Sequence, residues 1–204
     1  MTNQTFTQSL WSLNDLFPPD DPAAVQAAFK EIDARAADFE KYREELDPEI
    51  DLDQFLSIIR DLEGIQRQAM RLYGFAGLRF AADTQDQSAQ TLLAQVEQFM
   101  ATLENRSLFF SLWWKDLRDD QAQRLMQGSG DYRYWLEEMR HFKPHTLTEA
   151  EEKVINIKNV TGSNALGNLY DSLTNRYTFK VMVDGEEKEL TRGELMVYVR
   201  SSDP

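Results

Sequence analysis

The stretch from Asp51 to Leu117 decides the fold, and its sequence is DLDQFLSIIRDLEGIQRQAMRLYGFAGLRFAADTQDQSAQTLLAQVEQFMATLENRSLFFSLWWKDL. Its apolar residues recur at alternating three- and four-residue spacings, which is the period of one face of an α-helix. A helix that starts near Asp51 or Asp53 would carry the first such face, formed by Phe55, Ile58, Leu62, Ile65, Ala69, Leu72, Ala76 and Phe80. A second helix, starting between Asp83 and Asp86, would carry Leu92, Val96, Phe99, Leu103, Phe110, Trp113 and Leu117, with Arg106 interrupting one position.

These two helices are joined only at Ala82 to Thr84, so the sequence predicts an antiparallel hairpin of long helices. Gly74 and Gly77 lie near the end of the first helix, where glycine costs up to ~1 kcal/mol relative to alanine. Their presence indicates the close approach of a neighbouring backbone. The cluster from Leu108 to Trp114 is apolar on nearly every side, so it belongs either to an internal core or to a contact with another domain.

Upstream of this hairpin, residues 1–20 are expected to form an extended arm, because Pro18 and Pro19 end any local helix. The arm would lie in a groove on the body or serve as a docking peptide for another protein. Asp21 followed by Pro22 is a helix start. The apolar residues of the helix that follows are Val25, Ala28, Phe29, Ile32, Ala36, Phe39 and Leu46.

Downstream, a short helix is expected from Asp119 to Gln127, ended by the flexible joint Gly128-Ser129-Gly130. Asp131 would cap a further helix, which Pro144 ends. The apolar face of that helix would be formed by Tyr134, Trp135, Met139 and Phe142.

In the last part of the chain, the spacing of the apolar residues changes from helical to strand-like. Thr148 with Glu151 forms a capping box that opens a helix, and Gly162 is placed to end it. Ser163 would cap a second helix. The apolar face of this second helix would consist of Leu166, Leu169, Tyr170, Leu173 and Tyr177.

Strand-like alternation follows, with Phe179, Val181 and Val183 separated by Lys180 and Met182. Asp184-Gly185 supplies a turn, and Thr191 with Glu194 opens a last helix through Leu195 and Val199. The predicted fold class is therefore all-α, an antiparallel assembly of long helices with one small β-hairpin near the C-terminus. We expect an arm over 1–20, a long-helix hairpin domain over 21–127, and a helical segment with the hairpin over 131–204.

Three stretches of the chain resemble the oligoendopeptidase F branch of the thimet-oligopeptidase-like zinc metallopeptidases, peptidase family M3. They are LTEAEEKVI from Leu147, TGSNALGNLYDSLTNRYTF from Thr161 and TRGELMVYVRSSDP from Thr191. The segment LWSLNDLFP from Leu10 is similar to the short N-terminal signature of that family. The resemblance implies the N-terminal region of such a peptidase, with residues 131–204 leading towards a catalytic domain that is absent from this chain.

The resemblance also implies a zinc site that this chain lacks. Members of the family hold zinc with a helical His-Glu-x-x-His and a downstream Glu, and the intervening Glu activates water. The two histidines of the chain are His141 and His145, and neither is followed by Glu. We therefore expect no catalytic, cofactor-binding or metal-binding residue here, with zinc in the absent catalytic domain.

Other chemistries find no support in the sequence. His141 and His145 have the spacing of a helical metal pair, but Pro144 disfavours a helix at Lys143, so we interpret them as surface or capping residues at a helix end. Adjacent carboxylates such as Asp119-Asp120 and Glu151-Glu152 are typical of solvated helix faces, whereas acid–base catalysis needs two carboxyls in different environments. The nucleophile motif Gly-x-Ser-x-Gly and the phosphate-binding glycine loops are not found.

The composition and net charge of the chain limit the kinds of partner it can bind. The chain of 204 residues has a net charge of −13, which disfavours nucleic acid and anionic membranes. The acidity serves solubility or, alternatively, favours cationic peptides. The chain has no cysteine, no secretory signal and no long apolar segment, and we expect a cytoplasmic protein.

Two functions remain open. The first is the non-catalytic N-terminal domain of a zinc oligoendopeptidase that hydrolyses short peptides; by analogy with the family, it would form a wall of the substrate channel and pack on the catalytic domain of the same polypeptide. The second is a stand-alone helical protein-interaction module without enzymatic activity, whose partner surface would be the cluster from Leu108 to Trp114.

Overall fold

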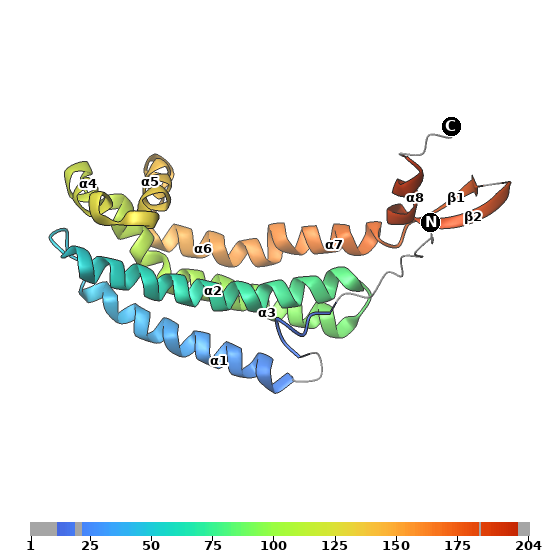
Figure 1. Cartoon of the computed structure of the whole chain (residues 1–204), viewed down its shortest axis with the longest axis horizontal. Coiled ribbons are helices and arrows are strands. Elements are labelled where there is room, and N and C mark those ends of the chain that lie inside the picture. The colour runs from blue at the N-terminus through green and yellow to red at the C-terminus, as the bar shows by residue number, and fades with distance from the viewer. Residues whose placement is uncertain (1–11, 19–21, 184, 200–204) are drawn as a thin grey trace, which may run out of the picture.

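The structure is a computed structural model and describes residues 12–18, 22–183 and 185–199. Figure 1 shows α1, α2 and α3 side by side, with α6 and α7 following one another along the α2–α3 hairpin and the strands beyond its end. The all-α fold class with one two-stranded hairpin is confirmed. The long elements are α1 (Pro22–Phe39), α2 (Leu52–Ala82) and α3 (Gln87–Asp116). They are followed by α4 (Asp119–Gly128), α5 (Arg133–His141), α6 (Glu149–Asn159), α7 (Ala165–Thr174), β1 (Thr178–Val183), β2 (Glu186–Thr191) and α8 (Arg192–Tyr198).

The hairpin of α2 and α3 begins where its capping residues predict. The Asp51 carboxylate accepts hydrogen bonds from the backbone amides of Asp53 and Gln54 at 2.9 and 3.0 Å. The Asp86 carboxylate accepts one from the amide of Ser88 at 2.7 Å. These bonds satisfy amides that the first helical turn leaves unpaired. The predicted antiparallel hairpin of long helices is thereby confirmed.

The predicted face of α2 is the main wall of the core, and every residue predicted for it is buried. On α3 the prediction is partly wrong, because Leu92, Phe99 and Trp113 are only half-buried while Leu93 and Trp114 are buried. Helix α3 packs against α1, α2, α5 and α6, so its buried surface is wider than one stripe. The cluster from Leu108 to Trp114 supplies internal core through three buried side chains, those of Phe109, Phe110 and Trp114.

Helix α1 covers α2 and α3 through Val25, Ile32, Ala36 and Phe39. It ends earlier than predicted, since a 3-10 helix over Glu40–Glu44 replaces the α-helix after Phe39. Within the expected arm, the structure describes residues 12–18, and Phe17 is buried against Phe75, with ring centroids 5.2 Å apart. The predicted helix cap Asp21 lies outside the described residues.

The face predicted for α5 is wrong in part. Leu136 is fully buried at 0% exposure, whereas Tyr134 is 72% exposed. The indole Nε1 of Trp114 donates a hydrogen bond to the carbonyl oxygen of Leu136 at 2.9 Å, which fixes the side of α5 that faces α3. Asp131 does not cap the helix, because a 3-10 turn over Gly130–Tyr132 leads directly into it.

The predicted break at Gly162 is also wrong. A single π-helical turn over Val160–Asn164 joins α6 to α7, so the two run on as one long helix. Gly162 is not among the glycines with positive φ, so it does not adopt the left-handed conformation that ends helices. Ser163 lies inside the π turn and caps nothing. The extra residue of a π turn widens the helix at one point without ending it.

The hairpin and the last helix follow the predicted pattern. Strands β1 and β2 are antiparallel, with Thr178 opposite Thr191 and Val183 opposite Glu186. Gly185 has φ of 83°, as the predicted turn requires, while Asp184 lies outside the described residues. The Thr191 hydroxyl accepts a hydrogen bond from the Glu194 amide at 3.4 Å, which confirms the second capping box. In the part of the chain that the structure describes, no helix is long and apolar enough to cross a membrane.

Candidate interaction surface

The two histidines do not form a metal site. His141 lies 3.4 Å from the Glu138 carboxylate through its Nδ1, and both side chains are substantially exposed. His145 ends the 3-10 turn Lys143–His145, outside the helix that carries His141. Within residues 12–18, 22–183 and 185–199, no group of three or more potential ligands could hold a metal ion. The described side chains therefore do not fit the zinc that the family resemblance implies.

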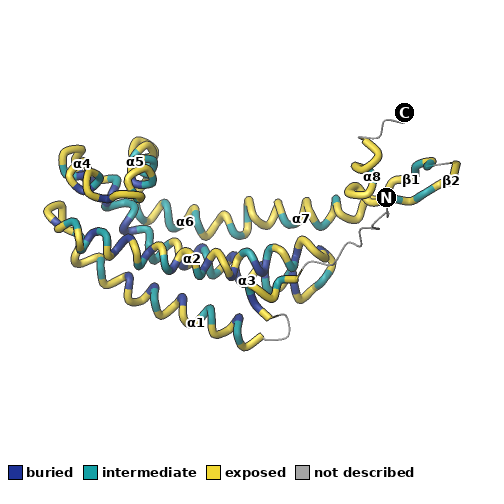
Figure 2. Tube along the Cα trace, viewed as in Figure 1, coloured by how far each residue is buried: buried dark blue, intermediate teal, exposed yellow. Residues whose placement is uncertain are grey.

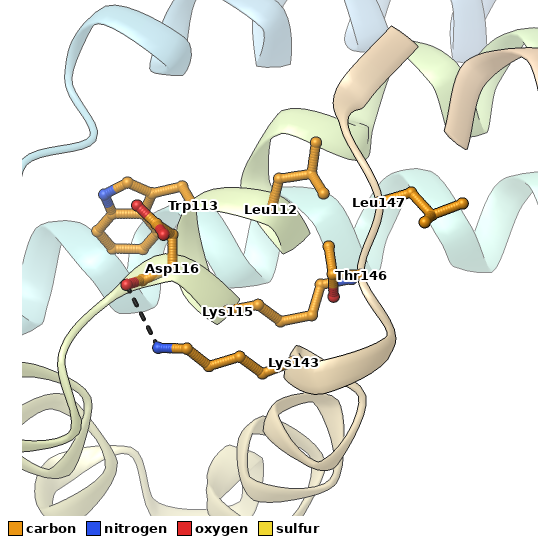
Figure 3. Close-up of a pocket in the computed structure, with 7 residues that line it drawn as sticks. All are labelled: Leu112, Trp113, Lys115, Asp116, Lys143, Thr146 and Leu147. Atoms are coloured by element: carbon orange, nitrogen blue, oxygen red, sulfur yellow. Dashed lines mark hydrogen bonds between the residues drawn. The ribbon is translucent and has the colours of Figure 1, made fainter. Parts of the chain in front are cut away.

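A cavity of about 450 Å³ lies where α3 ends, and Figure 3 shows its lining. The Nζ of Lys143 donates to the carbonyl oxygen of Asp116, another lining residue, at 3.5 Å, and to that of the neighbouring Leu117 at 2.9 Å. These carbonyls belong to the C-terminal turn of α3, where a positive charge is favourable. Lys143 thus caps the C-terminal end of α3. We interpret the charged group in this cavity as a helix cap and not as a ligand-binding residue.

Helix α6 is attached to the body by polar contacts. The Arg43 guanidinium donates to both carboxylate oxygens of Glu149, at 3.1 and 2.7 Å. This bond and a second one from Lys153 lower the pKa of Glu149 to about 2. Asn105 on α3 donates to the Lys153 carbonyl at 3.2 Å and accepts from the Asn156 amide at 2.9 Å.

Helix α7 is attached even more sparsely. Asn168 donates its side-chain amide to both carboxylate oxygens of Glu97 on α3, each at 3.2 Å. Gln85, in the turn between α2 and α3, donates to the carbonyl of Ser172 at 3.4 Å and accepts from Arg176. These contacts could not be predicted from the sequence, since single Asn and Gln residues carry no periodic signal.

Apart from these contacts, the C-terminal elements are open. Of the residues that the structure describes from α6 to α8, none is buried, and Figure 2 shows this run without the buried colour. The predicted helix α7 is present, but all five residues of its predicted apolar face are exposed. We call the exposed large hydrophobics from α6 to Val199 the C-terminal apolar surface. They are Val154, Ile155, Ile157, Leu166, Leu169, Tyr170, Leu173, Tyr177, Phe179, Met182, Met196, Val197, Tyr198 and Val199.

Large exposed apolar side chains concentrated on consecutive elements in this way indicate an interaction site. A two-stranded hairpin is at best marginally stable alone, so β1 and β2 also need a neighbour. The partner surface expected at Leu108 to Trp114 is corrected by these findings. That cluster is largely internal, with Trp114 fully buried, and the apolar surface open to a partner lies on α6 to α8.

Arg106 on α3 makes ion pairs that were not predicted from the sequence, at a position where the stripe would otherwise carry an apolar residue. Arg106, which interrupts the predicted stripe, donates to both carboxylate oxygens of Glu40 at 2.9 and 2.8 Å and to that of Asp33 at 2.7 Å. It therefore fastens α3 to α1 and the 3-10 turn that follows. The interruption of the stripe was the visible signal, but its partners become neighbours only in the fold.

Comparison with known proteins agrees with the sequence resemblance. Residues 113–179 match a family model described as Oligopeptidase F, which represents the N-terminal region of the M3 peptidases. Over 203 residues the chain is 23% identical to Oligopeptidase PepF of Bacillus subtilis, covering 96% of this chain and 29% of that protein. The chain thus spans less than a third of the length of this relative. No solved structure matches the chain.

The matched region runs from Trp113 in the core, through α5, α6 and α7, to Phe179 in β1, so it includes much of the C-terminal apolar surface. The family match and the relative together confirm the suspected resemblance. The chain is similar to the N-terminal region of the oligoendopeptidase F-like peptidases of family M3.

Proposed function

We propose that this chain forms the non-catalytic N-terminal domain of a cytoplasmic, zinc-dependent oligoendopeptidase that hydrolyses short peptides. The C-terminal apolar surface carries the proposal. Fourteen large hydrophobic side chains from α6 to Val199 lie exposed on elements that contain no buried residue among those described. Such a surface is covered in a larger assembly, and its proposed cover is the catalytic domain of the same polypeptide.

The relative supports this choice of partner. Oligopeptidase PepF is more than three times as long as the part that this chain matches. Zinc in our proposal is bound outside this chain, since the described residues offer no ligand group for it. By analogy with the family, the domain would form one wall of the substrate channel and so limit the size of the peptides admitted.

The first test is to read the coding sequence beyond codon 204. The proposal expects an in-frame continuation with His-Glu-x-x-His, and a stop codon at position 205 would overturn it. The second test uses this chain alone. We expect it to enhance the emission of a hydrophobic dye and to self-associate, and both effects should disappear when the remainder of the peptidase is co-expressed with it.

A stand-alone interaction module is the second candidate, and the same apolar surface would then bind another protein. The two candidates differ in what suppresses dye binding. Suppression by the remainder of its own polypeptide supports the peptidase domain. If the coding sequence contains no such remainder, the stand-alone interaction module becomes the favoured function.

A further inference from the structure

A groove runs between α2, α3 and the end of α6 with the π turn that follows it. It consists of two adjoining cavities, of about 290 and 270 Å³, which share Met70, Met100 and Glu104 in their linings. Each cavity is near the lower limit of the volume typical of small-ligand pockets. None of its lining residues belongs to the C-terminal apolar surface or to the cavity of Figure 3.

The floor of the groove is apolar and its charges are negative. Leu62, Ile65, Ala69 and Leu103 form a buried floor between α2 and α3. The charged lining residues are acidic, and neither Lys nor Arg nor His lines either cavity. Met70 and Met100 flank the groove with flexible, polarizable side chains that adapt to different apolar ligands.

Glu104 is the acidic group best placed to receive a ligand. Its side-chain carboxylate accepts no hydrogen bond within the described part of the chain, whereas Glu97 is already bonded to Asn168. The surrounding protein, together with the charge of Glu152, raises the pKa of Glu104. Glu104 is an exposed residue, and a cationic group beside it would relieve this like-charge repulsion and add a charge-assisted hydrogen bond.

The opposite wall adds hydrogen-bonding groups. Asn156, Asn159 and Asn164 lie along α6 and the π turn where these line the groove. Side-chain amides both donate and accept, so they suit the backbone of an extended peptide. Together, the apolar floor, an acidic group without a donor among the described residues and a row of amides favour one kind of ligand.

We propose that this groove binds a short peptide with a basic side chain next to apolar residues, the basic group being received by Glu104. The choice of a peptide rests on the proposed function, while the preference for positive charge rests on the groove itself. The groove would then be a secondary binding site that selects among the peptides presented to the enzyme.

The experiment is a titration of this chain, labelled with ¹³C in its methionine methyl groups, with the peptide Gly-Leu-Lys-Leu-Gly carrying an amidated C-terminus. We expect the methyl signals of Met70 and Met100 to shift, while those of Met182 and Met196 on the C-terminal apolar surface do not. Glu104→Gln should weaken the affinity about threefold to tenfold, as expected for the loss of one partly exposed charge pair. Glu137→Gln, an exposed residue of α5, is the matched control and should leave the affinity unchanged.

Acetylated Gly-Leu-Glu-Leu-Gly should not shift these signals. Equal shifts with both peptides would indicate a purely apolar occupant, such as a helix of the remaining polypeptide, and would overturn the inference. Unshifted Met70 and Met100 signals with the basic peptide would also overturn it. Either failure leaves the coding-sequence and dye tests of the proposed function untouched, and a stop codon at position 205 would overturn that function without affecting peptide binding by this chain.

Discussion

Asn168 on α7 donates hydrogen bonds to both carboxylate oxygens of Glu97 on α3, at 3.2 Å each, and Glu97 is only 7% exposed. This relationship joins the buried body to the helix whose apolar face is open. A buried carboxylate without a donor is costly, so the Asn168 amide contributes to holding α7 against α3. Among the described residues, the other side-chain hydrogen bonds between this region and the body involve Gln85, which donates to the carbonyl of Ser172 and accepts from Arg176.

Asn168→Ala should therefore loosen α7 specifically. Among the described residues, Asn168 is the one donor to the Glu97 carboxylate. Leaving a buried acceptor without its donor costs about 1–3 kcal/mol, and we expect this loss in the local opening free energy of α7. Native-state hydrogen exchange should show faster exchange over Ala165–Thr174, with unchanged protection in α2 and α3. Asn159→Ala, at an exposed residue of α6, is the control, and equal acceleration in both variants would contradict the prediction.

Helix α5 offers a matched pair of substitutions that tests its orientation. Leu136→Ala removes a fully buried side chain and should lower the free energy of unfolding by about 2–5 kcal/mol. Tyr134→Ala, two residues away, removes a side chain that is 72% exposed and should change it by no more than about 0.5 kcal/mol. Urea denaturation followed by tryptophan fluorescence measures both. A larger loss from Tyr134→Ala would show that the face predicted from the sequence is the buried one.

The contrast between α2 and α5 explains what the sequence could predict. The stripe of α2 continues for 31 residues, so its period alone identifies every buried position. Helix α5 has nine residues and aromatic side chains on both sides, so its pattern fits two orientations. The choice is made by Trp114 through its bond to the Leu136 carbonyl, and by Arg140, which donates to the Trp114 and Leu117 carbonyls at 2.8 and 2.9 Å.

The site was harder to predict than the fold for the same reason. The apolar face of α7 is visible in the sequence, but whether this chain covers it depends on contacts that no local pattern encodes. Gly162 illustrates the limit, because glycine is compatible both with a helix end and with a π turn. The amide-lined part of the groove at Glu104 likewise exists only because α6 runs beside α3.

Glu149 gives the chain a pH-dependent contact between α6 and the body. Its pKa in the folded chain, about 2, is below its ordinary value of 4.5, because Arg43 and Lys153 bind the charged form. A lowered pKa adds stability above pH 4.5 that is lost as the pH falls towards 2. Since the Glu149 side chain is one-third exposed, solvent screening limits the contribution to about 1 kcal/mol.

Glu149→Gln should therefore reduce the free energy of unfolding at pH 7 by about 1 kcal/mol and make little difference near pH 2. The measurement is urea denaturation at a series of pH values, repeated at high salt, where the difference should shrink. Glu137→Gln, an exposed residue of α5, should match the parent chain at every pH. A Glu149→Gln effect that persists undiminished at pH 2 would exclude the charge pair as its cause.

The glycines of α2 and α4 test how closely the helices approach one another. Gly74 and Gly77 were expected to allow a close approach, but a Cβ at either position would meet nothing within 4 Å. Both lie inside α2 without a positive φ, so neither the neighbours nor the backbone require glycine there. Gly74→Ala should raise the free energy of unfolding by about 0.5–1 kcal/mol, because alanine restricts the unfolded chain and favours the helix.

Gly128 at the end of α4 is the opposite case, because a Cβ there would collide with the side chain of Leu52 at the start of α2. Gly128→Ala should therefore destabilise the chain by about 1–3 kcal/mol, the usual cost of overpacking. Thermal or urea unfolding of the two variants against the parent chain measures the difference. Stabilisation by both substitutions would mean that α4 can move away from α2 at no cost, and destabilisation by both would place a neighbour against Gly74.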